Sequence, residues 1–164
     1  MGDVSRAAVG LSETERIALA MTACTLPKPE WTHHAHLRAG LWHVVTFGED
    51  QALVLLRERI TRYNTSVGTA NTDTSGYHET LTRFYVGLIA GFVRGRDCSV
   101  PLDDLAAALI AEHGDRELPL RFYSRERLFS VGARRGWMEP DLPKPEVRSP
   151  KPEARSLKPQ KPEA

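Results

Sequence analysis

Histidines gather in two short segments of this chain, and histidine is the side chain best suited to acid–base and metal chemistry near neutral pH. Three of the six lie in segment 31–36, which reads W-T-H-H-A-H, and another lies in segment 76–80, which reads G-Y-H-E-T. Each segment stands at the start of a stretch with helical periodicity, so the imidazoles are expected near a hydrophobic core. Buried imidazoles serve as metal ligands, acid–base groups or hydrogen-bonded supports, and all three roles are open here.

A metal site is one hypothesis for these residues. His33 and His36 have the i, i+3 spacing that helical bundles use for metal ligands, and His78 would supply a third imidazole. Glu79 or Asp73 would add an oxygen ligand, a donor set that suits a divalent metal, zinc or non-haem iron. The chain contains no H-E-x-x-H motif, so the ligands would have to come together from separate helices.

A metal-free catalytic pocket is the second hypothesis. A histidine beside a carboxylate can act as general base or acid, and the candidate catalytic residues are His78, Glu79 and His33. The candidate substrate-binding residues are polar side chains near these segments, together with one arginine able to clamp an anion: Asn71, Asp73, Tyr77, Tyr63 and Arg121. Structural alternatives stand beside each role, because His78 could bond to the nearby polar loop, His33 could cap its own helix, and Arg121 could pair with an acid.

Helical patterns dominate the chain, and no alternating strand pattern of useful length occurs. A capping box at 12–15 begins a helix that runs to about residue 23, after which P-K-P at 27–29 favours an extended connection. Further helices are expected at 33–47 behind the N-cap Thr32, and at 50–63, 78–94, 101–113 and 124–135. The fold class is therefore an all-α, compact bundle of five to six helices.

The long polar loop at 64–76 is the most unusual connection. Its asparagine, threonine and aspartate residues favour turns, with Thr74 or Ser75 able to cap the next helix. Long ordered loops are also often functional. We expect it to cover a buried polar pocket between the second and fourth helices.

Composition indicates one globular domain followed by a tail. The chain has 164 residues, of which 41% are hydrophobic and 26% are charged. We expect a helical domain at 1–140 and a disordered tail at 141–164, where a K-P/P-E pattern repeats with almost no apolar residue. The tail is a solubilising extension or a docking segment.

The net charge and the hydrophobic pattern of the chain argue against nucleic acid and membranes as partners. A net charge of +1 argues against nucleic acid, and the absence of an apolar run of about 18 residues argues against a membrane span. The N-terminus lacks the pattern of a signal peptide, and Cys24 and Cys98 form no C-x-x-C motif. A cytoplasmic location and a small polar molecule as partner are therefore expected.

Three strings resemble those of a small uncharacterised bacterial family: W-T-H-H-A-H-L at 31–37, N-T-D-T-S-G-Y-H-E-T at 71–80 and Y-S-R-E-R-L-F-S at 123–130. The resemblance covers about residues 26–142 and excludes the tail. In the family pattern the first string reads W-T-H-x-A-H-L, which matches His33 and His36 and leaves His34 at the variable position. The resemblance implies an all-α fold and the place of a site, and it implies no activity.

Together these features favour a small-molecule enzyme with a histidine-rich pocket, either assisted by zinc or iron or free of metal. The main alternative is a module that binds or sequesters a small molecule without converting it. A structural or interaction protein that uses the tail is the second alternative.

Overall fold

The computed structural model describes residues 10–144, and every regular element in this part of the chain is a helix, with no strand. Its elements, in chain order, are α1 Glu13–Thr22, η1 Lys28–Glu30, α2 His33–Phe47, α3 Glu49–Ser66, α4 Glu79–Arg94, α5 Leu102–His113, η2 Leu118–Arg121, α6 Arg125–Leu128 and α7 Val131–Arg135. The predicted all-α fold class is confirmed. Most of the predicted tail, residues 145–164, lies outside the described part.

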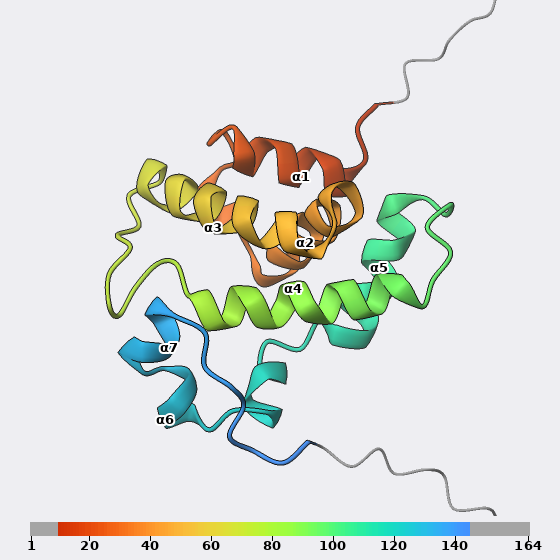
Figure 1. Cartoon of the computed structure of the whole chain (residues 1–164). Helices are drawn as coiled ribbons and strands as arrows, with labels where there is room; N and C mark the ends of the chain where they lie inside the picture. The colour runs from red at the N-terminus through yellow and green to blue at the C-terminus, as the bar shows by residue number, and fades with distance from the viewer. Residues whose placement is uncertain (1–9, 145–164) are drawn as a thin grey trace, which may run out of the picture.

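Helix α2 is the centre of the bundle. It contacts α1, α3, α4 and α5, while α4 in turn contacts α3 and α7. Figure 1 shows α4 crossing the molecule, with α1, α2 and α3 on one side and the short helices α6 and α7 on the other. The two histidine segments begin α2 and α4, and these two helices pack against each other.

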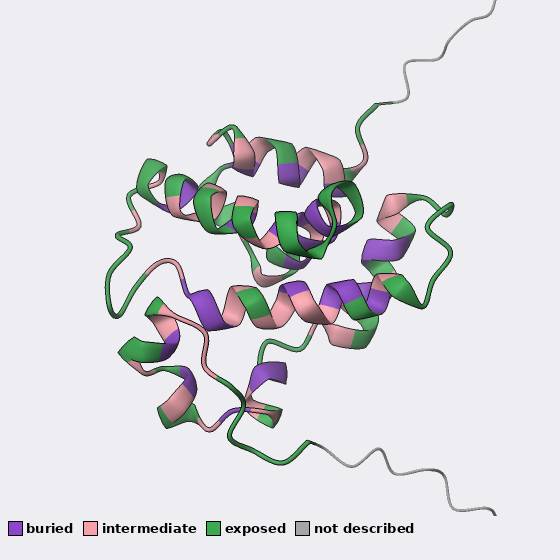
Figure 2. Ribbon diagram, in the orientation of Figure 1, coloured by how far each residue is buried: buried purple, intermediate pink, exposed green. Residues whose placement is uncertain are grey.

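The sequence of α2 explains its central place. Apolar or small residues occupy most of its circumference, and they are buried at Ala35, Leu37, Ala39, Gly40, Leu41 and Val44. A helix that is apolar nearly all round is stable only when other elements enclose it. Helix α4, in contrast, alternates buried and exposed faces, as Figure 2 shows.

Helix caps confirm several predicted boundaries. Ser12 and Glu15 form the expected capping box at the start of α1. The Thr32 hydroxyl accepts from the Ala35 amide, and α2 ends at Gly48, where φ is 78°. A positive φ is a conformation that glycine adopts without steric cost.

Four features of the secondary structure differ from the prediction. Helix α3 continues to Ser66, so the loop begins at Val67 rather than at residue 64. His78 is the N-cap of α4, the role expected of Thr74 or Ser75. The predicted helix 124–135 is divided, because the Ser130 hydroxyl caps a new helix by accepting from the Ala133 amide. Residues 28–30 form a 3₁₀ turn where an extended connection was expected.

Contacts of the helical unit extend slightly beyond the predicted domain boundary. The Asp141 carboxylate accepts hydrogen bonds from the backbone and the hydroxyl of Ser124, at 2.7 and 2.6 Å. The Leu142 amide donates to the Phe122 carbonyl. The packed chain therefore reaches residue 142, two residues past the expected end of the domain.

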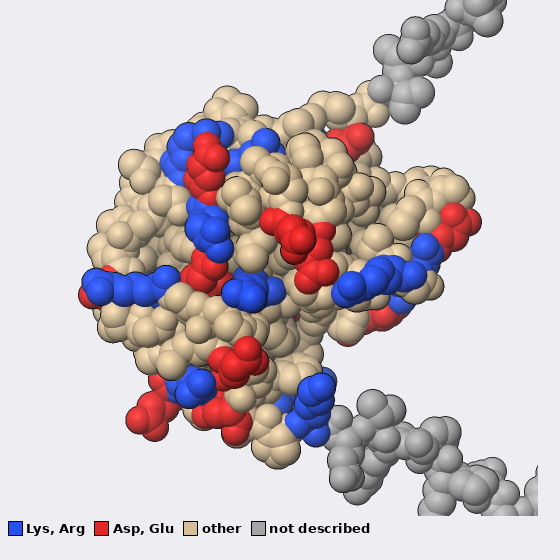
Figure 3. All heavy atoms as spheres, in the orientation of Figure 1, with Lys and Arg blue, Asp and Glu red and all other residues tan. Residues whose placement is uncertain are grey.

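Charged side chains of both signs intermingle on the surface seen in Figure 3. Several form ion pairs across the described surface, such as Arg16 with Glu30 at 2.7 Å and Arg38 with Asp103 at 3.2 Å. In the described residues, no helix combines the length and the apolar character that a bilayer crossing requires.

His43 is a buried support of this core. Its Nδ1 donates to the Ala39 carbonyl at 2.7 Å, and its Nε2 accepts from Arg59 at 2.9 Å. Burial lowers the pKa of His43 to about 4. The ring is therefore neutral at physiological pH, and its protonation would place a second cation beside Arg59.

This burial predicts a pH dependence of stability. In the unfolded chain His43 takes up a proton near its ordinary pKa of about 6.5, whereas the folded chain resists protonation down to the lowered pKa. The unfolded state therefore binds more protons as the pH falls, and the free energy of unfolding should drop by about 2 kcal/mol between about pH 7 and pH 5 from this group. Urea unfolding of the wild type and of His43→Gln at the two pH values would isolate the effect. An equal pH dependence in both proteins would contradict the role assigned to His43.

Candidate functional site

A cavity of about 630 Å³ lies between α2, α3 and α4. Its walls are largely apolar, with Leu37, Leu56, Ile60, Leu81 and Ile89 among the lining residues. Thr69, Gly76 and Tyr77 bring the 67–78 loop to one side of it. A cavity therefore lies between the second and fourth helices, where a buried polar pocket was expected, but its walls are mostly apolar, and the loop forms part of them.

Two residues of the cavity wall carry buried polar atoms without a partner. Nε2 of His33, from the first turn of α2, and the hydroxyl of Tyr85, from α4, have no hydrogen bond to any described residue. The two rings meet edge to face, with centroids 5.7 Å apart. A buried polar group without a hydrogen-bond partner lowers the stability of the folded state by about 1–3 kcal/mol. Two such groups in one cavity wall therefore indicate a functional role.

The surroundings of His33 and Tyr85 determine the protonation state of each side chain at neutral pH. Burial lowers the pKa of His33, and the neighbouring His34 and Arg116 lower it further. Burial raises the pKa of Tyr85 to about 12. At neutral pH the cavity thus holds a neutral imidazole, able to accept a proton, beside a phenol able to donate a hydrogen bond.

His36 lines the same cavity and packs against an aromatic neighbour. Its ring lies over Trp31, with centroids 3.8 Å apart and planes inclined by 30°. Nδ1 donates to the Thr32 carbonyl at 2.6 Å, which leaves Nε2 as the unprotonated nitrogen of the neutral ring. His36 is exposed to solvent, unlike the buried imidazole that was expected, and desolvation of its ring lowers the pKa of His36 below its ordinary value. His33 and His36 are thus two neutral imidazoles in one wall.

His78 holds a different position, because both of its ring nitrogens are engaged. Nε2 donates to the Leu128 carbonyl at 2.8 Å, and Nδ1 accepts from the Leu81 amide at 3.2 Å. The residue is 7% exposed. His78 therefore caps α4 and ties it to α6, which is the supporting role rather than the catalytic role predicted for it.

These hydrogen bonds also decide against the predicted three-histidine ligand set. A metal ligand needs a free nitrogen lone pair, and the His78 ring has none to offer. In the described residues no group of three or more histidine, cysteine, aspartate or glutamate side chains is placed to hold a metal ion. His33, His36 and His78 share a cavity wall, but their arrangement does not fit zinc or iron.

Glu79 belongs to a separate polar network. Its carboxylate accepts from Arg57 Nε at 2.9 Å and from the Tyr77 hydroxyl at 2.7 Å. The hydrogen bond from Arg57 lowers the pKa of Glu79. Glu79 lines a second cavity of about 620 Å³ and not the histidine cavity. A paired carboxylate of lowered pKa is a weak base, so the predicted pairing of Glu79 with a catalytic histidine does not occur.

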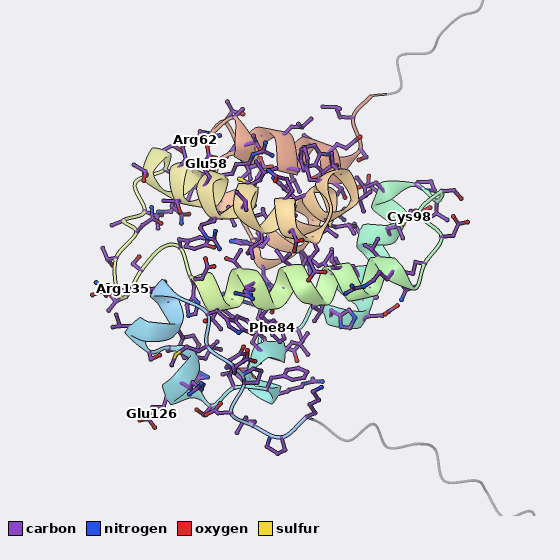
Figure 4. The ribbon with its side chains drawn as sticks, in the orientation of Figure 1. Glu58, Arg62, Phe84, Cys98, Glu126 and Arg135 are labelled. Atoms are coloured by element: carbon purple, nitrogen blue, oxygen red, sulfur yellow. The ribbon has the colours of Figure 1, made fainter. Side chains whose placement is uncertain are left out.

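Asn71 and Asp73 organise the loop instead of facing the histidines. Asn71 Oδ1 accepts from the Asn64 side chain and from the Tyr77 amide, both at 3.0 Å. Asp73 pairs with Arg135 at 2.6 Å. Figure 4 shows Arg135 on α7, beside the segment that leads into α4. Both predicted substrate-binding residues line the second cavity and serve there as loop contacts.

Of the three remaining predicted substrate-binding residues, one lines the histidine cavity and two do not. Tyr77 lines both cavities, with its hydroxyl committed to Glu79. Tyr63 is fully buried, and its hydroxyl donates to the Leu26 carbonyl at 3.1 Å. Arg121 forms an exposed pair with Asp115 at 3.1 Å. Neither Tyr63 nor Arg121 lines the histidine cavity.

Tyr85 and Arg116, the two cavity residues with most functional interest, were absent from the predicted site. Tyr85 belongs to the apolar stripe of α4, and that position in the sequence indicates only packing. Arg116 lies between α5 and η2, far along the chain from both histidine segments. Only the spacing of Tyr85 seven residues after His78, two turns along the same helix face, gave a signal for either residue.

Comparisons with protein-family models, with curated proteins and with solved structures gave no match to this chain. The site is therefore interpreted from its own residues.

Proposed function

We propose that this protein is a small-molecule enzyme that performs acid–base chemistry in the cavity between α2, α3 and α4. The observation that carries the proposal is the pair of unpartnered buried polar atoms, His33 Nε2 and the Tyr85 hydroxyl, in the wall of one cavity. The volume of about 630 Å³ lies within the range of small-molecule sites, which are mostly apolar with a few polar groups that orient the ligand.

His33 and Tyr85 suit complementary roles. The neutral His33 ring accepts a proton from the substrate at Nε2, as a general base does. The protonated Tyr85 hydroxyl donates a hydrogen bond to an oxygen on which negative charge develops. The apolar walls strengthen both interactions, because electrostatic effects are larger where water is excluded.

A non-catalytic binding module is the second candidate, and one observation favours it. His33 Nε2 has no partner among the described residues, whereas catalytic histidines are commonly oriented by a carboxylate. The same two polar atoms would then recognise a ligand without converting it. The two candidates share one site and differ in whether the bound molecule changes.

The substitutions His33→Gln and Tyr85→Phe test the proposal by their effects on kcat/KM. Purified wild-type protein is incubated with a small-molecule extract of cells, and mass spectrometry identifies the compound that is converted. With that compound, His33→Gln should lower kcat/KM by about 100-fold, because general base catalysis contributes at least that factor. Tyr85→Phe should lower it by about tenfold or more, since one donor to a developing oxyanion is lost.

His34→Gln is the matched control. His34 is adjacent, exposed and not part of the cavity wall, and burial alone still lowers the pKa of His33, so replacement of His34 should leave kcat/KM at neutral pH unchanged. Equal losses in His34→Gln and His33→Gln would contradict the assignment of the base. A compound that raises the melting temperature in a His33-dependent way, and is recovered intact, would establish the binding module instead.

A further inference from the structure

The lining of the histidine cavity holds one formal charge. Its histidines are neutral under physiological conditions for the reasons given above, and no aspartate or glutamate is among the described residues of its wall. The guanidinium of Arg116 is the one permanently charged group there. A site with a single fixed cation complements a ligand with a single negative charge.

Arg116 has no acidic partner within the described chain. It takes part in none of the ion pairs between residues 10 and 144, although eight other arginines do. The adjacent carboxylate, Asp115, bonds instead to Arg121 and to the Glu117 amide. Arg116 is thus left available for a charged group from outside the protein.

Arg116 also acts on the two histidines that the cavity presents. Its positive charge lowers the pKa of both His33 and His36, while the Asp115 carboxylate, which is bonded to Arg121, raises the pKa of His33. Apolar side chains such as Leu37 and Leu81 line the same cavity as Arg116 and His33. The cavity therefore offers a cationic group, an apolar middle and a hydrogen-bonding pair.

We infer that the ligand of this cavity is an amphipathic monocarboxylate, with its carboxylate on Arg116, its apolar body against the aliphatic wall and a polar group at His33 and Tyr85. This inference rests on the proposed function and adds to it the class of substrate. An arginine can bind a carboxylate through two parallel hydrogen bonds, which orients the molecule as well as attracting it.

The test uses two probes that differ only in charge. 6-Hydroxy-2-naphthoate carries a carboxylate, a flat apolar body and a distant hydroxyl, while 6-hydroxy-2-naphthamide replaces the carboxylate with a neutral amide. Titration calorimetry on the full chain should give a Kd about tenfold lower for the acid, the effect of a hydrogen bond to a charged group. In Arg116→Gln this preference should disappear.

Arg125→Gln is the control, because Arg125 is another exposed arginine without a described acidic partner and lies outside the cavity wall. It should keep the preference for the acid. Equal binding of the two probes to the wild type, or a preference that persists in Arg116→Gln, overturns the inference. If both probes bind equally and His33→Gln weakens both, the substrate class fails while the proposed site stands. Failure of both probes to bind contradicts the cavity as a site and the inference with it.

Discussion

Replacement of His78 by alanine should lower the free energy of unfolding by about 3 kcal/mol, the sum of a lost helix cap and a lost buried hydrogen bond. The cap is the bond that Nδ1 accepts from the Leu81 amide, and the buried bond is the one that Nε2 donates to the Leu128 carbonyl. Loss of the ring leaves that carbonyl without its donor in the interior. Urea unfolding followed by circular dichroism measures the change.

His78→Asn separates the two contributions. Asparagine is a good N-cap, so it can still accept from the Leu81 amide, but its shorter side chain does not reach Leu128. We expect His78→Asn to recover about 1 kcal/mol of the loss. Identical stability of the alanine and asparagine variants would show that capping by His78 contributes nothing.

The same variants test whether His78 supports the fold or takes part in chemistry. If His78 is a support, His78→Asn should retain most of the activity found for the wild type, while His33→Gln should not. A folded His78→Asn protein with fully abolished turnover would instead place His78 in the reaction. The hydrogen bonds of the ring favour the first outcome, because neither nitrogen is left to accept a substrate proton.

Local signals in the sequence predicted the helical framework well. The bounds of α2 agree with the prediction because Thr32 and Gly48 are strong start and stop residues, whose effects depend on their own backbone. Where the signals were weaker, at the end of α3 and within 124–135, the predicted bounds were wrong. Ser130 is itself a favoured N-cap residue, but the helical periodicity continues past it, so this signal for a second short helix was missed.

The site was only partly predictable, for a physical reason. Histidines 33, 36 and 78 line one cavity because they lie in the first turns of α2 or at the start of α4, two helices that pack against each other. Their roles depend on partners that arrive from distant parts of the chain, such as the Leu128 carbonyl, 50 residues from His78. Sequence spacing within one helix cannot reveal such a partner, so a supporting histidine and a free one look alike.

The 67–78 loop is also ordered by contacts with residues that lie far from it in the sequence. Asn71 joins the end of α3 to the start of α4, since its side chain bonds to the Thr61 carbonyl, the Asn64 amide group and the Tyr77 amide. Arg134 of α7 donates to the carbonyls of Gly76 and Tyr77, at 3.0 and 3.2 Å. The loop is thereby fixed between two helices and against the cavity that it lines.

Gly76→Ala should therefore disrupt this loop. Gly76 has φ of +77°, and a Cβ there would lie 2.6 Å from the Ala70 carbonyl oxygen and 2.8 Å from the Asn71 Cα. Those neighbours are backbone atoms that cannot turn aside, so the loop must shift and lose bonds to Asn71. We expect a loss of about 3 kcal/mol in the free energy of unfolding, from backbone strain together with broken hydrogen bonds.

Gly68→Ala is the matched control, because Gly68 has nearly the same φ, +76°, and open space where its Cβ would stand. It should cost only the strain of a left-handed alanine, about 1 kcal/mol. Since Gly76 and Tyr77 line the cavity, Gly76→Ala should also weaken binding of 6-hydroxy-2-naphthoate, whereas Gly68→Ala should leave it unchanged. Equal effects of the two substitutions on stability and on binding would mean that the close approach at Gly76 does not hold the loop against the cavity.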